Sequence, residues 1–273
     1  MSQNLLASLH KKGLNLKVYT PEYVAKHPDL QGLLSARSHV GGTPLLPPGF
    51  AWPQALWQED GAKDESNVPL IFSAQIDLSD IQGYACAAQL PDHGLLSFFS
   101  CGDNYNYVDP NSCKVLYFED VSSLVPTPMP ETKAQLKLIP ECRFQVFSEL
   151  TFMSIGEIED EVNPIVTSDG HTLTEAERTQ LIDNYEDYLE QLIDEGKYAE
   201  EDFLEFLGYG YYIQNCPLQP GSVHLFTLNS AYDSEKIEWI YTIGDAGSIY
   251  FMIDSEDLKK HDFSKVFCES QCF

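Results

Sequence analysis

The sequence predicts a single α+β domain, rich in antiparallel strands, with an acidic helical segment inserted between two strand-rich halves. Three observations support this fold class. Short runs of β-branched and aromatic residues bounded by turn residues recur in both halves, one capping box opens the longest helical pattern, and acidic residues concentrate between the halves. We expect the strand-rich halves at about residues 38–150 and 208–273 and the acidic helical segment at about 157–207.

Residues 1–13 predict a short amphipathic helix, whereas residues 14–40 give a mixed pattern. Leu5 and Leu9 lie four residues apart, which favours a short amphipathic helix. The lysines of this region follow its apolar residues, the reverse of the order in a signal peptide. Thr20 followed by Pro21 is typical of the N-cap and first position of a second helix.

Residues 41–53 predict an extended loop, because prolines at four positions exclude a helix and a central strand. Gly41 and Gly42 open this loop and have no strand before them and no helix after them. We therefore interpret them as residues that permit unusual backbone angles, and not as a phosphate-binding loop. The strands expected next are Leu70–Leu78, Leu95–Phe99, Lys114–Phe118 and an edge strand at Ala134–Ile139.

The clearest helix begins after Thr174, which forms a capping-box pattern with Glu177. Gly196 is the expected C-cap glycine, and a shorter helix is expected at Glu200–Leu207. Five apolar positions follow helical spacing and predict the buried face of the first helix: Leu181, Tyr185, Tyr188, Leu192 and Ile193.

The last third predicts a return to strands, at Val223–Leu228, Ile237–Ile243, Ser248–Ile253 and Lys265–Cys268, with a helical turn near residues 256–260. Residues 70–99 and 223–252 follow a similar order. Each begins with a strand that ends near an acid or an amide, continues to a glycine-containing turn, and finishes with an aromatic strand. Either an internal duplication or a chance similarity of two strand pairs explains this pattern.

Charge restricts the classes of partner. The formal net charge of −26 disfavours nucleic acid and anionic membranes, which attract cationic surfaces. Seventeen acidic residues against two basic ones lie between residues 157 and 205, so a basic protein is the expected partner. The alternative is that the charge only keeps the protein soluble.

The cysteines and the apolar runs favour a cytoplasmic protein. Seven cysteines without a C-x-x-C pair are expected to be reduced, and no apolar run approaches the ~20 residues that span a bilayer. No phosphate-loop, nucleophile-elbow or zinc-protease motif occurs, so we expect no cofactor and no metal site.

Four patches of sequence resemble the YwqG family, in that family's order and spacing. They lie at residues 38–53, at 69–78 with 90–99 and 115–120, at 207–214, and at 244–272, and so cover about 38–120 and 203–273. Two positions depart from the family pattern: Ile243 replaces a usual tryptophan and Gly210 a usual proline. The resemblance implies a β-rich α+β fold and implies no activity.

Two carboxylates are candidates for a shared site. Asp77 ends an apolar strand, and Asp245 sits in a glycine-flanked turn before another. If the two strand pairs are related by a pseudo-two-fold axis, these acids approach each other, with Gln75 and the Gly41–Gly42 loop nearby. His93, a histidine in a turn, is a candidate base for the same site. The structural alternative is that each aspartate accepts backbone N–H groups and fixes its own turn.

These observations favour a binding or protein-interaction module over an enzyme. One form is an acidic, immunity-like protein that neutralises a basic toxin, with Glu186, Asp187 and Glu190 on the partner surface. The alternative is a hydrolase-type enzyme with a carboxylate-centred site built from Asp77, Asp245 and His93.

Overall fold

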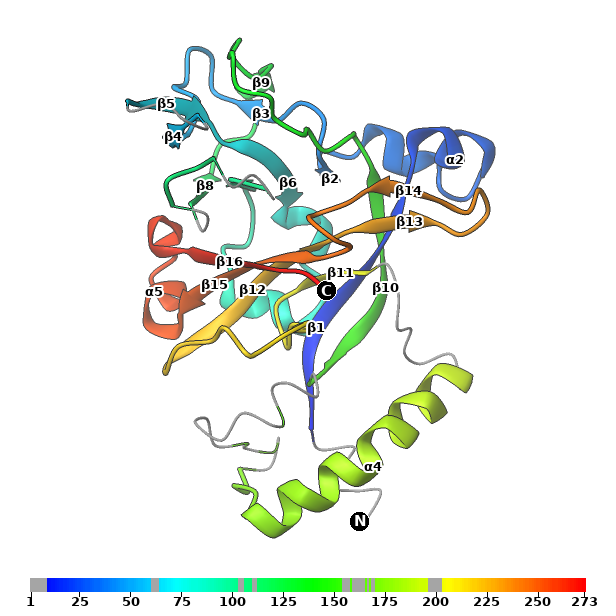
Figure 1. Ribbon diagram of the computed structural model, residues 1–273. Coiled ribbons are helices and arrows are strands. Elements are labelled where there is room, and N and C mark those ends of the chain that lie inside the picture. Colours follow the sequence, from blue (N-terminus) through cyan, green and yellow to red (C-terminus); the bar gives the residue numbers. More distant parts are fainter. Residues whose placement is uncertain are drawn as a thin grey trace.

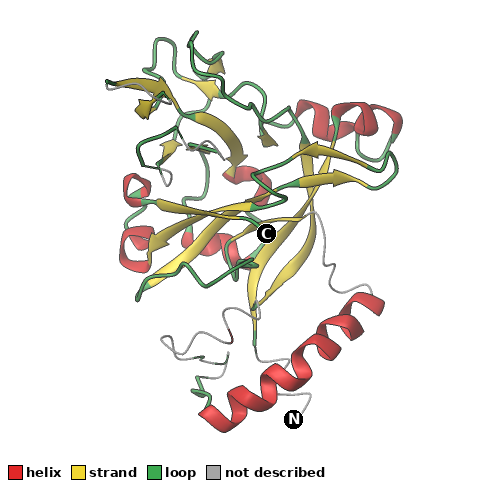
Figure 2. Cartoon of the chain, in the orientation of Figure 1, coloured by secondary structure: helices red, strands yellow, loops and turns green. Residues whose placement is uncertain are grey.

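The computed structural model describes residues 9–59, 64–102, 106–109, 112–153, 158, 165, 167, 170–195 and 203–273 (Figure 1). Every strand pair in it is antiparallel, and strands predominate over helices, which confirms the predicted β-rich α+β class (Figure 2). Among the described helices, none is long and apolar enough to cross a membrane.

The larger sheet has six strands in the order β10-β1-β11-β12-β15-β16. Their bounds are Arg143–Phe152, His10–Tyr19, Phe203–Phe206, Ser222–Asn229, Ser248–Asp254 and Phe267–Gln271. This sheet combines strands from both predicted halves, from the acidic segment and from the N-terminal residues, so it crosses the boundaries that the sequence suggested. Whether the chain is one domain with those subdivisions stays a prediction.

Two helical predictions are wrong here. Residues 10–19 form β1, in the interior of the larger sheet, and the helix expected over the first 13 residues otherwise falls on residues outside the described part. The helix expected at 200–207 is replaced by β11 over Phe203–Phe206. All four β11 residues are buried, and β11 pairs with β1 on one side and β12 on the other, so strand pairing outweighs the local helical pattern.

The smaller sheet has the order β2-β6-β7-β8, with bounds His39–Val40, Ile71–Asp77, Leu95–Ser100 and Cys113–Phe118. The three longer strands confirm the sequence prediction. Short pairs β3–β9 (Leu45–Leu46, Val125–Pro126) and β4–β5 (Gln54–Gln58, Glu65–Pro69) flank it. The strand expected at Ala134–Ile139 is absent from these described residues: Ile139 instead packs into the core, and its carbonyl accepts the Gly42 N–H.

Phenylalanine rings join the two sheets. Phe98 of β7 is fully buried, with ring centroids 4.7 Å from Phe226 of β12 and 5.2 Å from Phe251 of β15. Burial of each such ring stabilises the fold by about 1.5–3 kcal/mol. The core therefore lies between the sheets.

The long helix α4, Glu175–Asp194, lies beyond the end of the larger sheet (Figure 1). Its capping box is present as predicted, because Thr174 Oγ1 accepts the Glu177 N–H and the Glu177 carboxylate accepts the Thr174 N–H. The five predicted apolar positions are buried or half-buried, and Leu181 and Tyr185 pack against Leu9 and Met153. The predicted C-cap, Gly196, lies outside the described residues.

Two shorter helices confirm the predictions made from the sequence. α2, Pro21–Lys26, has Thr20 as its N-cap, and α5, Ser255–Lys259, follows β15. Between β12 and β15 stands a separate hairpin of β13, Ala231–Asp233, and β14, Glu238–Tyr241. This hairpin extends toward α2 (Figure 1). The pairs β6–β7 and β12–β15 both carry a register shift, but they have different connections, and the internal duplication stays a prediction.

Candidate binding groove

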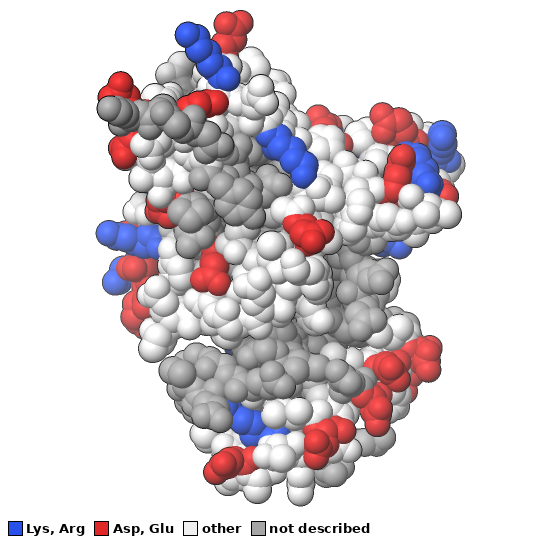
Figure 3. All heavy atoms as spheres, in the orientation of Figure 1, with Lys and Arg blue, Asp and Glu red and all other residues white. Residues whose placement is uncertain are grey.

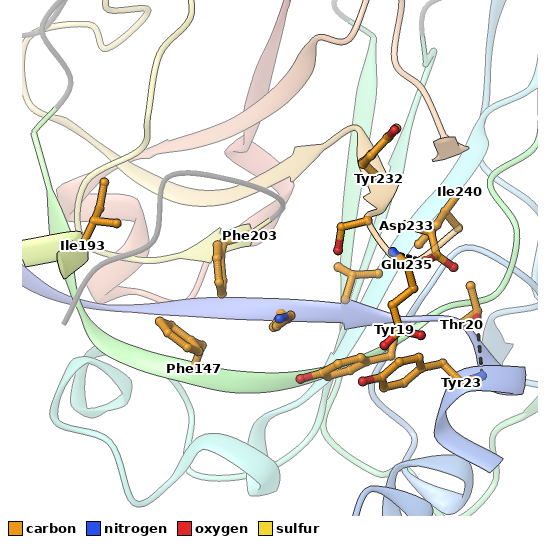
Figure 4. Close-up of a pocket in the computed structure, with 13 residues that line it drawn as sticks. Tyr19, Thr20, Tyr23, Phe147, Ile193, Phe203, Tyr232, Asp233, Glu235 and Ile240 are labelled. Carbon is orange, nitrogen blue, oxygen red and sulfur yellow. Dashed lines mark hydrogen bonds between the residues drawn. The ribbon is translucent and has the colours of Figure 1, made fainter. Parts of the chain in front are cut away.

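A groove of about 570 Å³ lies beside Phe203, the first described residue of β11. β1 continues past Phe203 with Val18 and Tyr19, which pair with β10 on one side only among the described strands. The facing wall is the β13–β14 hairpin, and residues from β1, α2, β10, α4 and β11 complete the lining (Figure 4). The lining residues are Lys17, Val18, Tyr19, Thr20, Tyr23, Phe147, Ile193, Phe203, Tyr232, Asp233, Ser234, Glu235 and Ile240.

Stacked tyrosines form one wall. The rings of Tyr19 and Tyr23 stack with centroids 5.3 Å apart, and Tyr23 stacks in turn on His27 at 3.8 Å. The N-cap of α2 holds this arrangement, because the Tyr23 N–H donates to Thr20 Oγ1 at 3.2 Å. Burial, with a smaller contribution from Tyr23, raises the pKa of the Tyr19 hydroxyl, so the ring stays neutral at physiological pH.

A phenylalanine pair forms the opposite end of the groove. Phe147 of β10 and Phe203 of β11 have ring centroids 4.8 Å apart. Phe147 is 47% exposed although it is large and apolar. Exposed aromatic surface inside a groove is typical of a surface that binds a ligand or another protein.

Charged groups line the rim. Asp233 and Glu235 come from the hairpin, and Lys17 from β1. Lys236 lies 3.2 Å from the Asp233 carboxylate, and the backbone N–H of Lys236 is the main cause of the lowered pKa of Asp233. The hairpin side of the groove is therefore anionic at neutral pH, while Lys17 adds one positive charge to the β1 side.

An acidic stripe on α4 adjoins this groove. Ile193 of α4 lines the groove, and four exposed acids occupy helix positions i, i+4, i+7 and i+11: Asp183, Asp187, Glu190 and Asp194. This spacing places all four on one face of the helix, opposite the buried Leu181 and Tyr185. Figure 3 shows acidic side chains over this helix. The predicted surface residues Asp187 and Glu190 belong to the stripe; the side chain of Glu186 lies outside the described part.

The base of the hairpin is fixed by one serine. Ser230 Oγ donates to the Gly247 carbonyl at 2.8 Å and accepts the Ile243 N–H at 2.9 Å. At the hairpin tip, Ile237 has φ of 58° and is 78% exposed. A β-branched residue in the left-handed region is a strained exception, so the tip keeps an apolar side chain at a conformational cost.

The predicted residues Gln75 and Asp77 are buried in a different place, near Arg37. Asp77 pairs with Arg37 at 2.7 Å and accepts the Ser79 N–H at 3.0 Å. The Gln75 amide donates to the Arg37 carbonyl and accepts the Leu45 N–H. These bonds fix the turn after β6 and the chain around Arg37, as the structural interpretation expects.

Gly41 and Gly42 adjoin this network and have φ of 56° and 70°. A Cβ at Gly41 would lie 2.3 Å from the Pro140 carbonyl oxygen. The geometry thus supports the conformational interpretation of both glycines, because both have a positive φ and a Cβ at Gly41 would clash with backbone.

Asp245 and His93 are exposed and have their own neighbours. The Asp245 carbonyl accepts the Phe273 N–H, and His93 pairs with Asp92 in the turn before β7. No hydrogen bond or ion pair between described residues joins Asp77, Asp245 and His93, so the shared carboxylate site gains no support. No metal-binding cluster occurs in the part of the chain that the structure describes.

No sequence pattern predicted the groove. The sequence predicted a mixed pattern around Tyr19 and Tyr23 and a helix at Phe203. It predicted no element at Phe147. The available signal was the alternation of polar and apolar residues in Arg143–Phe152, which is typical of a strand with one exposed face.

A family model for the domain of unknown function DUF1963 matches residues 38–272. No curated protein matches the chain. The matched range includes both sheets apart from β1, whereas Lys17 to Tyr23 of the groove precede it. The chain therefore belongs to the family of proteins with the domain of unknown function DUF1963.

Proposed function

We propose that this protein is a binding module that holds a basic, aromatic-anchored segment of a partner protein in the groove between β1 and the β13–β14 hairpin. The observation that carries the proposal is the continuity of the aromatic groove with the acidic stripe of α4, through Ile193. A single partner segment can therefore meet apolar and anionic surface together.

The chemistry of recognition divides between the two surfaces. An aromatic or aliphatic side chain of the partner packs between the Tyr19–Tyr23 stack and the Phe147–Phe203 pair. Lysine or arginine residues on either side meet the hairpin acids and the α4 stripe, and an arginine gains further attraction over the tyrosine rings. Lys17 repels cations locally, so the basic residues of the partner lie toward α4 and the hairpin.

The net charge of −26 adds long-range attraction for such a partner. In one form of this proposal, the partner is a basic toxin that this protein neutralises. The hydrolase alternative lacks comparable support, since Asp77 is occupied by Arg37 and the Ser79 N–H.

The test uses two labelled peptides of equal positive charge, one with a central tryptophan and one with glycine in its place. Binding is measured by fluorescence anisotropy for the wild type and for Tyr19→Ala and Phe147→Ala. We expect the tryptophan peptide to bind more tightly, and each variant to lose about tenfold in affinity, which corresponds to ~1.4 kcal/mol.

Leu138→Ala is the matched control, because Leu138 is 54% exposed and does not line the groove. It should leave the affinity unchanged. Equal binding of both peptides, or equal losses in the control and the groove variants, would contradict the proposal.

A further inference from the structure

Two sheet edges meet at a pair of cysteines. β8 is the edge strand of the smaller sheet and β16 is the edge strand of the larger one. Cα atoms of β8 and β16 come within 8 Å of each other. Cys113 opens β8, and its Sγ donates to the Val266 carbonyl at 3.7 Å, two residues before Cys268 of β16.

The two thiols contact each other and differ in exposure. Cys268 is 5% exposed and belongs to the main core, whereas Cys113 is half-buried and packs against that core. The hydrogen bond that the Cys268 thiol donates to Cys113, followed by burial, raises the pKa of the Cys268 thiol. A third cysteine, Cys101, is 2% exposed, and burial raises its pKa to about 12. Oxidants therefore reach Cys113 first.

We propose that Cys113 and Cys268 form a reversible disulfide that joins the two sheets when the protein meets a peroxide. The Cys113 thiolate attacks one peroxide oxygen, so an S–O bond forms, the O–O bond breaks and hydroxide leaves as water after protonation. The Cys268 thiolate then attacks the Cys113 sulfur, so the S–S bond forms, the S–O bond breaks and a second water leaves. Two thiols and one hydrogen peroxide thus give one disulfide and two waters.

The position of the bond makes it consequential. The contact between β8 and β16 lies beside the phenylalanine packing that joins the sheets, since Cys268 pairs with Phe251 and Cys113 precedes Val115, which belongs to the same core. A bond between residues 113 and 268 encloses more than half of the chain, and closing a long loop restricts the unfolded state most. The oxidised protein is therefore more resistant to unfolding than the reduced one.

The experiment treats the reduced full chain with a small excess of hydrogen peroxide, alkylates the remaining thiols and maps the peptides by mass spectrometry. We expect a linked peptide pair that contains Cys113 and Cys268, a fall in intact mass of about 2 Da, and a rise in the thermal midpoint of about 5 °C or more that a reductant reverses. The rate should increase with pH, because the thiolates react.

Two variants complete the test. Cys268→Ser should abolish the link and leave Cys113 as a sulfenic acid that a dimedone probe captures. Cys272→Ser, which changes a half-buried cysteine four residues further on, should leave the link intact. A link between Cys101 and Cys113, or progression of Cys113 to sulfinic acid in the wild type without any link, would overturn the proposal.

Discussion

The imidazole of His224 and the hydroxyl of Thr227 lie on one face of β12, with Nε2 and Oγ1 2.7 Å apart. Residues three apart on a regular strand point to opposite faces. A register shift between His224 and Phe226 in the pairing with β15 reverses this, and it places His224 opposite Met252 and Thr227 opposite Tyr250. The bulge thus supplies a partner for a histidine that is 2% exposed.

This geometry predicts acid sensitivity. Burial is the main cause that lowers the pKa of His224 to about 3, whereas an unfolded histidine titrates near 6.5. Because the unfolded state binds the proton first, the stability is present above pH 6.5 and is lost as pH falls from there toward 3. The slope approaches ~1.4 kcal/mol per pH unit, on the order of 3 kcal/mol between pH 6.5 and 4.

Urea unfolding at several pH values between 7 and 4 measures this slope. His224→Gln should be less stable at pH 7, because the buried contact with Thr227 changes, and should show a shallower decline toward acid. His39 is also buried with a lowered pKa and leaves part of the decline in the variant. Parallel curves for variant and wild type would show that His224 does not cause the sensitivity.

The N-cap of α4 should contribute measurably to stability. Thr174 both accepts the Glu177 N–H and has its own N–H satisfied by the Glu177 carboxylate. Thr174→Ala should therefore lower the free energy of unfolding by ~1 kcal/mol, measured by urea denaturation. Thr179→Ala is the control, because Thr179 is exposed within the helix and alanine has the higher helix propensity, so it should stabilise slightly. Similar changes in both variants would argue against a capping effect.

The buried and the exposed candidate aspartates should behave differently. Asp77 is 3% exposed and bonded to Arg37 and to the Ser79 N–H, so Asp77→Asn should cost about 1–3 kcal/mol. Asp245 is exposed, and Asp245→Asn should change the unfolding free energy by less than about 0.5 kcal/mol. Thermal denaturation of both variants measures this contrast, and a large effect at Asp245 would revive the shared carboxylate site.

Local sequence signals predicted the helices whose caps lie within their own residues. Strands such as β11 form because they pair with strands distant in the sequence. The capping box of Thr174 and the Thr20–Pro21 pair act within one helix turn, so the sequence alone located α4 and α2. β11 has four residues and depends on β1 and β12 on either side, which no local pattern reveals. The groove depends on the same pairing, because Phe203 of β11 and Lys17 to Tyr19 of β1 both line it.

Ile237 at the tip of the β13–β14 hairpin should affect stability and binding in opposite directions. Ile237 is strained at φ of 58°, and asparagine tolerates that region better. Ile237→Asn should raise the free energy of unfolding by about 0.5–1 kcal/mol, measured by urea denaturation. If the exposed isoleucine contacts the partner, the same variant should bind the tryptophan peptide more weakly. A destabilised variant would show that the tip is relaxed in solution.

The acidic stripe of α4 should govern the salt dependence of binding. Asp187 and Glu190 are exposed on one face of the helix, together with Asp183 and Asp194. Replacing both Asp187 and Glu190 with lysine should weaken binding of a basic partner at least tenfold at low ionic strength, because two charges change sign and the net charge becomes about four units more positive. The loss should shrink as salt rises, since charges further apart than about 8 Å are screened at physiological ionic strength.

A control separates local attraction from net charge. Glu131→Lys combined with Glu65→Lys changes the total charge equally at exposed sites away from α4 and from the groove. If only net charge matters, both double variants lower the association rate constant to the same extent at every salt concentration. If the stripe contacts the partner, the α4 variant also dissociates faster, because lost contacts raise the dissociation rate whereas long-range steering alters association. Stopped-flow measurement of both rates with the tryptophan peptide distinguishes the two, and an unchanged dissociation rate in the α4 variant removes the stripe from the binding surface.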